Sequence, residues 1–180
     1  MIDQNMPQQI NATTLAATAV IDSPDALARL IGRVLTVRGW KLATAESCTG
    51  GRVAQLITSQ PGASLYFDRG FVTYSNRAKI EQLGVAANLL AALGAVSAPV
   101  ARQMAQGARR AAGVEVAVAI TGIAGPTGGS LEKPVGTVFI AGAGPAGTVV
   151  ERHLFQGARD QIQARSAAAA LDLIWSLLSR

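Results

Sequence analysis

The sequence predicts an α/β fold, a single three-layer α/β/α domain with a mixed, mostly parallel sheet. Segments with helical spacing of apolar residues alternate with short apolar runs, which is the pattern of strands separated by covering helices. One run, residues 114–121, is almost entirely apolar, as expected of a strand buried on both faces. The length of 180 residues and a hydrophobic fraction of 49% suit one domain with a substantial core.

The N-terminal part of the chain divides into an extension and the start of the domain. Residues 1–22 are polar, with one short apolar patch, and we expect them to form a flexible extension before a domain over residues 23–180. Ser23-Pro24-Asp25 predicts a helix start, because it supplies a capping hydroxyl, a proline and an acid in the first turn. Gly39 is expected to end that helix.

The remaining elements follow from the same signals. Residues 65–74 alternate well enough for a strand, with a bulge or turn at residues 68–70. We expect two further strands to pair across residues 144–147. The other predicted strands are residues 40–45, 114–121, 135–143 and 148–155, and the predicted helices are residues 52–59, 76–83, 86–93, 98–112 and 161–178.

Composition restricts the partners. The net charge is +5, but the basic residues are spread along helices without interleaved aromatics, so no nucleic acid is expected and anionic small molecules are favoured. No apolar run approaches the roughly 18 residues of a membrane span. Cys48 is the only cysteine, which fits a cytoplasmic protein, and with one histidine it argues against a zinc site. We expect no cofactor and, from the alanine-rich helices, a homo-oligomer.

The stretch at residues 44–51 places a hydroxyl between a predicted strand and a predicted helix. Ser47 on such a turn would lie beside backbone N–H groups that the first helical turn leaves unpaired. A nucleophile next to donors for an oxyanion is what an acyl-transfer enzyme needs, and Thr49, Gly50 and Gly51 would supply those donors. The alternative is that serine and glycines here serve only capping and close packing.

Cys48 competes with Ser47 as the nucleophile. A thiol at a helix N-terminus is more acidic than usual and intrinsically reactive. Adjacent residues on a turn point in different directions, so only one of the two is expected to face a substrate. The alternative is that Cys48 is a small buried side chain.

A serine nucleophile also needs a base. His153 lies within a predicted strand and is interpreted as a surface or packing residue. Lys79 falls in the first turn of a predicted helix, where the helix dipole and the neighbouring Arg77 both disfavour an ammonium and lower its pKa. Tyr74 could hold the lysine or relay a proton. Alternatively, Lys79 is solvated and Tyr74 belongs to an amphipathic strand.

A third polar cluster is the glycine-rich loop at residues 121–129. It matches neither the Walker A sequence nor the dinucleotide fingerprint, and its glycines could admit a substrate or simply form a crossover loop. All three clusters follow predicted strands. Because ligands of α/β sheets bind beyond the carboxyl ends of the strands, we expect the clusters to converge.

Four ordered segments, residues 45–51, 70–76, 94–97 and 121–136, resemble the CinA carboxy-terminal domain family, in its stand-alone nicotinamide-nucleotide amidohydrolase (NMN deamidase) form. The resemblance covers residues 24–178. It implies hydrolysis of the carboxamide of nicotinamide mononucleotide to nicotinate mononucleotide and ammonia, in pyridine-nucleotide salvage.

The resemblance also implies roles for individual residues. Ser47 matches the nucleophile, Lys79 the general base and Tyr74 its helper, while Thr121 and Gly122 match a substrate-binding loop. The substrate phosphate needs cationic partners, for which the candidates are Arg69, Arg77 and Lys133. Two alternatives remain open: a catalytically silent module that binds a nucleotide or a competence-related partner, and an amidase for another small amide.

Overall fold

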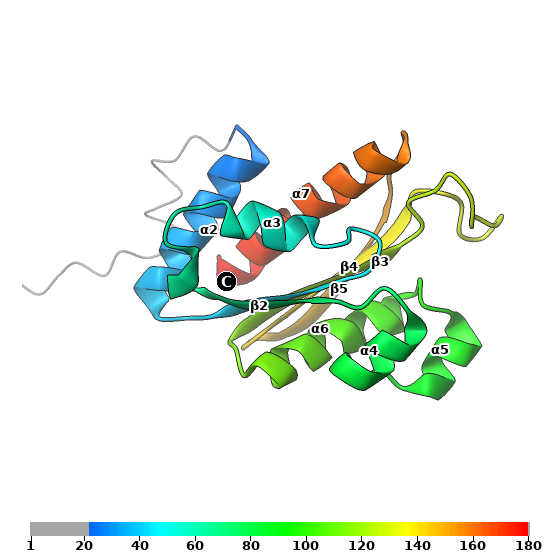
Figure 1. Ribbon diagram of the computed structural model, residues 1–180, viewed down its shortest axis with the longest axis horizontal. Helices are drawn as coiled ribbons and strands as arrows, with labels where there is room; N and C mark the ends of the chain where they lie inside the picture. The colour runs from blue at the N-terminus through cyan, green and yellow to red at the C-terminus, as the bar shows by residue number, and fades with distance from the viewer. Residues whose placement is uncertain (1–21, 180) are drawn as a thin grey trace, which may run out of the picture.

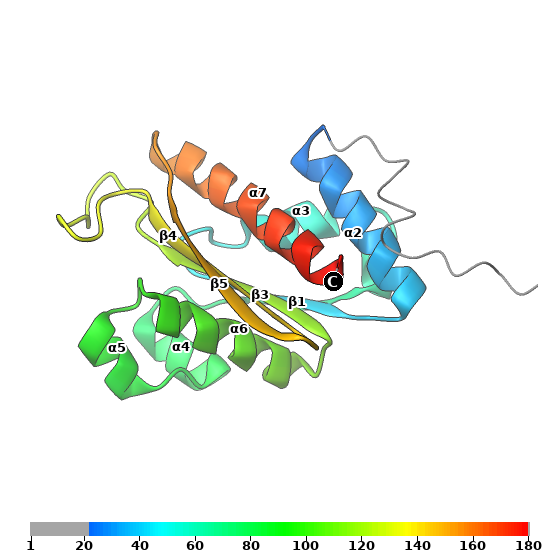
Figure 2. The ribbon, with the colours of Figure 1, turned by 180° about the vertical axis from the view of Figure 1, so that it is seen from behind.

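A computed structural model describes residues 22–179, so the expected extension lies outside the described residues except for Asp22. Figure 1 shows three layers, with one group of helices above the sheet and one below; Figure 2 shows the same layers from behind. The elements in chain order are α2 (Pro24–Arg38), β1 (Leu42–Glu46), α3 (Arg52–Thr58), the 3₁₀ helix η1 (Ala63–Leu65), β2 (Phe67–Val72), α4 (Asn76–Leu83), α5 (Ala87–Leu93), α6 (Ala98–Ala112), β3 (Val116–Gly122), β4 (Thr137–Gly144), β5 (Gly147–Leu154) and α7 (Arg159–Leu178).

The sheet has the strand order β2-β1-β3-β4-β5. Strand β1 pairs in parallel with β2 and β3, whereas β4 pairs antiparallel with β3 and β5. The sheet is therefore mixed, as predicted, but the expectation of a mostly parallel sheet was too strong, because the two kinds of pairing are equal in number. The physical reason is that no helix joins β3 to β4, and a parallel return needs such a crossover.

Local signals in the sequence are confirmed in the first elements. Ser23 Oγ accepts a hydrogen bond from the Ala26 N–H at 3.2 Å, and Gly39 ends α2 with φ of 65°. The register shifts between β1 and β2, so that Asp68 is the extra residue of a bulge. Strand β2 is shorter than predicted, because residues 63–65 form η1 before it.

The core lies on both faces of the sheet and fixes the two helix layers. Helices α2, α3 and α7 cover one face; α6 covers the other and carries α4 and α5 (Figures 1 and 2). Small residues allow close approach: a Cβ on Gly107 of α6 would lie 2.0 Å from the Leu83 carbonyl oxygen at the end of α4. This packing sets the position of α4, whose first turns lie beyond the carboxyl end of β2. Among residues 22–179, no helix is both long and apolar enough to cross a bilayer.

Candidate active site

The Ser47 turn lies directly after β1, at the carboxyl ends of the parallel strands. The Ser47 N–H donates to the Ile120 carbonyl of β3 at 3.0 Å, so the turn continues the sheet before it leaves it. The Ser47 side chain is half-buried. Thr73 extends the neighbouring strand in the same way, since its N–H donates to the Glu46 carbonyl at 2.9 Å. The first two predicted clusters therefore meet at one edge of the sheet.

Glu46 holds this turn from within the core. Its side chain is 1% exposed, and its carboxylate accepts hydrogen bonds from the N–H groups of Gly51 at 3.0 Å, Val53 at 3.1 Å and Ala54 at 2.9 Å. The first turn of α3 is thus satisfied by a carboxylate of the chain itself, which suits the positive end of the helix. Sequence reasoning missed this role of Glu46, although an acid before a strand-to-helix turn is a recognisable signal.

This arrangement corrects the expected set of oxyanion donors. The Gly51 N–H is bound to Glu46, and the Gly50 N–H donates to the Ser47 carbonyl at 3.2 Å. Of the groups on the turn, the backbone N–H groups of Cys48 and Thr49 form no hydrogen bond with the described residues. These two are the donors that the turn leaves available for an oxyanion beside Ser47.

Lys79 reaches Ser47 from α4. Its Nζ lies 3.1 Å from Ser47 Oγ, 2.8 Å from the Thr73 carbonyl oxygen and 3.2 Å from the Tyr74 carbonyl oxygen. The side chain is 1% exposed, so it is not the solvated helix lysine of the alternative interpretation. A neutral amine has two N–H donors and one lone pair. Two carbonyls and one hydroxyl are the set of partners that a neutral amine can satisfy.

Burial lowers the pKa of the Lys79 amine below its ordinary value. Within residues 22–179, no carboxylate lies within ion-pair distance of Nζ to offset this loss of hydration. The expected contribution of Arg77 is not found: its guanidinium is 84% exposed and lies 3.6 Å from the Glu81 carboxylate. The lowered pKa was predicted, and its main cause is desolvation.

Tyr74 takes part through its backbone, and its phenol points elsewhere. The Tyr74 hydroxyl accepts a hydrogen bond from Arg159 Nη2 at 3.1 Å, and Arg159 Nη1 donates to the Gly125 carbonyl at 2.7 Å. Arg159 therefore joins the Tyr74 segment to the glycine-rich loop. Gln163, one turn further along α7, donates to the Cys48 carbonyl at 2.7 Å. Neither residue was predicted, because only the tertiary fold brings α7 to this edge.

Cys48 is buried, which corrects the expectation of an acidic thiol. Its side chain is 5% exposed within the core cluster beneath α3 and α7. Burial raises the pKa of this thiol to about 12. The thiol therefore stays protonated near neutral pH, and the alternative of a small buried side chain holds.

The glycine-rich loop is anchored to the segment after α5. The Thr121 hydroxyl donates to the Ala95 carbonyl at 2.9 Å, and Lys133 Nζ donates to the Leu93 carbonyl at 2.9 Å. A Cβ on Gly122 would lie 2.7 Å from Val138 Cγ2, so this glycine permits packing against β4. Arg69 forms an exposed pair with Asp68. Thr121, Gly122, Lys133, Arg69 and Arg77 thus have structural or solvent-facing contacts, and Arg159 is the cation bound to the loop.

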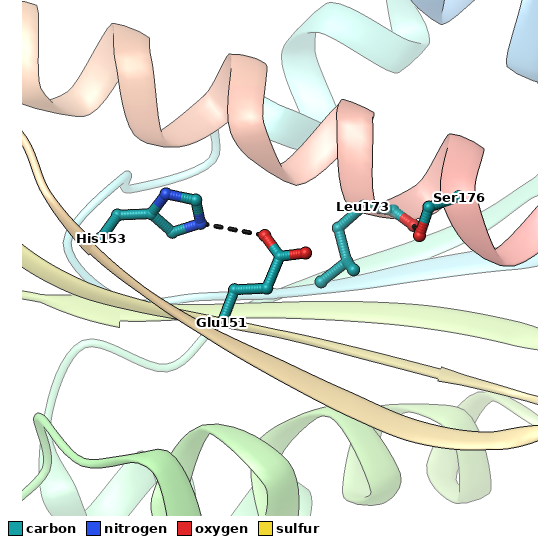
Figure 3. A network of polar contacts seen from close by, with 4 residues as sticks. All are labelled: Glu151, His153, Leu173 and Ser176. Carbon is teal, nitrogen blue, oxygen red and sulfur yellow. Dashed lines mark hydrogen bonds and ion pairs between the residues drawn. The ribbon is translucent and has the colours of Figure 1, made fainter.

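His153 lies on β5, beneath α7, as Figure 3 shows. Its Nε2 is 3.0 Å from the Glu151 carboxylate, and its ring stacks on Phe155 with centroids 5.1 Å apart. The interpretation of His153 as a packing residue is confirmed.

A cleft of about 460 Å³ lies between the glycine-rich loop and the start of α7. Ala124, Pro126 and Val135 form its apolar side, and Arg159 and Gln163 form its polar side. Because Gln163 also binds the Cys48 carbonyl, the cleft adjoins the Ser47 turn. A small molecule with an anionic group can lie here with its other end near Ser47 and Lys79.

Glu46→Gln tests whether the three hydrogen bonds to α3 position the Ser47 turn. An amide keeps one acceptor oxygen and turns an NH₂ toward backbone N–H groups, so we expect the free energy of unfolding to fall by about 1–3 kcal/mol. We also expect kcat to fall about tenfold or more. Glu115→Gln is the matched control, because its carboxylate accepts the Lys41 N–H at 2.8 Å at the far end of the sheet. Denaturant unfolding and turnover are measured on both; loss of stability with unchanged kcat in Glu46→Gln would show that Glu46 acts on stability alone.

Comparison with known proteins gives relatives of two lengths. The chain is 54% identical over 155 residues to the CinA-like protein of Syntrophobacter fumaroxidans, covering 86% of this chain and 37% of that protein. It is 51% identical over 150 residues to the nicotinamide-nucleotide amidohydrolase PncC of Escherichia coli, covering 83% of this chain and 91% of that protein. The chain thus spans little more than a third of the longer curated relatives that it matches.

Solved structures agree with the fold. The competence/damage inducible protein CihA of Agrobacterium tumefaciens superposes with a TM-score of 0.84 at 41% identity, over 89% of this chain and 99% of that chain. The competence damage-inducible protein A of Klebsiella pneumoniae gives a TM-score of 0.85 at 36% identity, over 88% and 99%. The model of the CinA C-terminal domain matches residues 24–178, so this chain belongs to the CinA C-terminal domain family.

Proposed function

We propose that this protein hydrolyses the carboxamide of nicotinamide mononucleotide to nicotinate mononucleotide and ammonia, with Ser47 as nucleophile and Lys79 as base. The observation that carries the proposal is the buried Lys79 amine, 3.1 Å from Ser47 Oγ, with no carboxylate among residues 22–179 to hold it as a cation. The similarity to a protein named nicotinamide-nucleotide amidohydrolase supports the choice of substrate.

The chemistry follows from the contacts. Neutral Lys79 takes the Ser47 proton as Oγ bonds to the carboxamide carbon, while the Thr73 and Tyr74 carbonyls hold the other two N–H bonds and keep the lone pair toward Ser47. The Cys48 and Thr49 N–H groups receive the oxyanion, and each such donor is typically worth ~3–4 kcal/mol. The Lys79 ammonium then protonates the departing amine, which leaves as ammonia.

The second half of the reaction repeats these steps with water. Lys79, neutral again, accepts a proton from water as its oxygen attacks the acyl carbon on Ser47. Collapse of the tetrahedral intermediate breaks the ester bond, and the proton on Lys79 returns to Ser47 Oγ. The products are the carboxylate of nicotinate mononucleotide and the free enzyme.

Arg159 supplies the positive charge for the substrate phosphate. It lines the 460 Å³ cleft and is held by the Tyr74 hydroxyl and the Gly125 carbonyl, so its guanidinium is already oriented. We expect Arg159→Ala to raise KM about tenfold or more with a smaller effect on kcat, because a hydrogen bond to a charged group is worth about 1.5–3 kcal/mol. Arg165→Ala, on the exposed side of the same helix, is the control. An unchanged KM in Arg159→Ala would remove this residue from phosphate binding.

The proposal is tested by assaying ammonia and nicotinate mononucleotide from purified protein and nicotinamide mononucleotide. We expect turnover, with a lower kcat/KM for nicotinamide riboside, which lacks the phosphate. Saturable binding without turnover would favour the silent binding module, and faster reaction of the riboside or of simple amides would favour another amidase. We place the reaction in the cytoplasm, because Cys48 is the only cysteine, and homo-oligomer formation stays a prediction for light scattering to test.

A further inference from the structure

A second cavity lies at the opposite edge of the sheet from Ser47. It has a volume of about 290 Å³ and is formed by one face of α2 and the segment that joins α3 to β2. The Tyr66 carbonyl accepts the Leu42 N–H at 2.7 Å, which places this segment at the amino end of β1. Ser47 follows the carboxyl end of the same strand. The proposed reaction therefore makes no use of this cavity.

Two arginines line the cavity from one face of α2. Arg29 and Arg33 are one helical turn apart, and both are exposed. The ion pairs formed within residues 22–179 involve other cations, so neither guanidinium has a carboxylate within 4 Å. Arg29 Nε meets only the amide oxygen of Gln60, at 3.5 Å. Like charges at this spacing disfavour one another, and a bound anion would relieve the repulsion.

The rest of the cavity is apolar and firmly built. Tyr66 is 3% exposed, and its ring packs so closely on α2 that a Cβ on Gly32 would lie 2.5 Å from its Cζ. Leu65 and Val37 line the same cavity with 62% and 58% of their surfaces exposed. Large apolar side chains left in solvent beside two cations suit a ligand that has an apolar body and an anionic group.

We propose that this cavity binds a small phosphomonoester. The phosphate dianion matches two guanidiniums better than a carboxylate does, because it carries a second charge and a third acceptor oxygen. The organic group of the ester lies against Leu65, Val37 and Tyr66. The volume is near the lower end of the roughly 300–1,000 Å³ found for small-molecule sites, so the ligand is a small metabolite.

The test is an NMR titration of the full chain that follows the backbone amide signals of Gly32 and Gly62, both in the cavity lining. These signals separate this cavity from the cleft beside Ser47. We expect phenyl phosphate to shift them saturably, and inorganic phosphate and phenol to bind at least tenfold more weakly. The double variant Arg29→Ala/Arg33→Ala should weaken phenyl phosphate binding at least tenfold and leave turnover unchanged. Arg110→Ala, on the opposite face of the sheet, is the matched control.

Several outcomes would overturn the proposal. Phenyl phosphate might as well be absent if millimolar additions leave the Gly32 and Gly62 signals unmoved, or if the double variant binds it as tightly as the parent. Equal binding of inorganic phosphate would remove the organic group from the site, and equal binding of phenol would remove the arginines. Arg33→Glu, which keeps Arg29, provides a second variant should the double variant fold poorly, and it is expected to abolish binding.

Discussion

Ser47→Ala is expected to lower kcat on nicotinamide mononucleotide by at least about 10³-fold. The substitution removes the atom that would bond to the carboxamide carbon, and residual rates in such variants come from binding and oxyanion stabilisation alone. The Ser47 side chain is half-buried on a turn held by Glu46 and β3, so the fold should survive the loss of one hydroxyl. Ammonia release at saturating substrate measures the effect.

Cys48→Ala is the matched control at the neighbouring position. Its thiol is buried with a pKa of about 12, so we expect kcat within about threefold of the parent and a modest loss of stability from the small cavity. Full activity in Ser47→Ala together with loss of activity in Cys48→Ala would reverse the assignment of the nucleophile.

Lys79→Ala is expected to reduce kcat by a similar factor, and Lys79→Arg should be nearly as inactive. Arginine keeps the positive charge but has a pKa above 12, so it cannot accept the Ser47 proton. This pair of variants separates base catalysis from a simple need for a cation. Retention of more than a tenth of the activity in Lys79→Arg would contradict the role of base.

The pH dependence gives a second reading of the same group. The proposed base acts as a neutral amine, so kcat/KM should rise with pH while the ammonium loses its proton and then reach a plateau. Because burial lowers the pKa of Lys79, the plateau should begin below the ordinary lysine value of about 10.4. Lys41→Ala is the control, since its amine contacts the Leu65 carbonyl at the other end of the sheet. A profile without this rise would contradict the assignment.

Folding stability should follow the same sign. A lowered pKa in the folded state means that the unfolded chain binds more protons between the two pKa values, so the contribution of Lys79 to the free energy of unfolding rises with pH in that window. At pH below the folded pKa, the cost of burying the ammonium is present in full. Lys79 therefore accepts a stability cost at neutral pH in exchange for a reactive amine.

Local sequence features were sufficient for most elements. The cap at Ser23, the stop at Gly39, the bulge at Asp68 and the antiparallel pair of β4 and β5 all depend on neighbouring residues, and each is confirmed. The proportion of parallel pairing was not predictable in this way, because it depends on which side of β3 the returning β4 joins.

The polar clusters show the same division. That Ser47 and Thr73 follow parallel strands could be read from the order of the elements, and their convergence follows from the general geometry of α/β sheets. The partners of each group could not be read in this way. Whether Glu46 or a substrate occupies the start of α3, and whether Arg77 or Arg159 faces the cleft, depends on contacts between residues far apart in the chain.

By itself, the sequence determined the α/β architecture, the turn that carries Ser47 and the helix that carries Lys79, because caps, glycine stops and apolar spacing act over a few residues. Only the tertiary structure decided that Lys79 is desolvated against two carbonyls, that Cys48 is buried, and that α7 brings Arg159 to Tyr74. The reason is that hydration and hydrogen-bond partners are set by the packing of distant segments, and these two quantities decide whether an amine is a cation or a base.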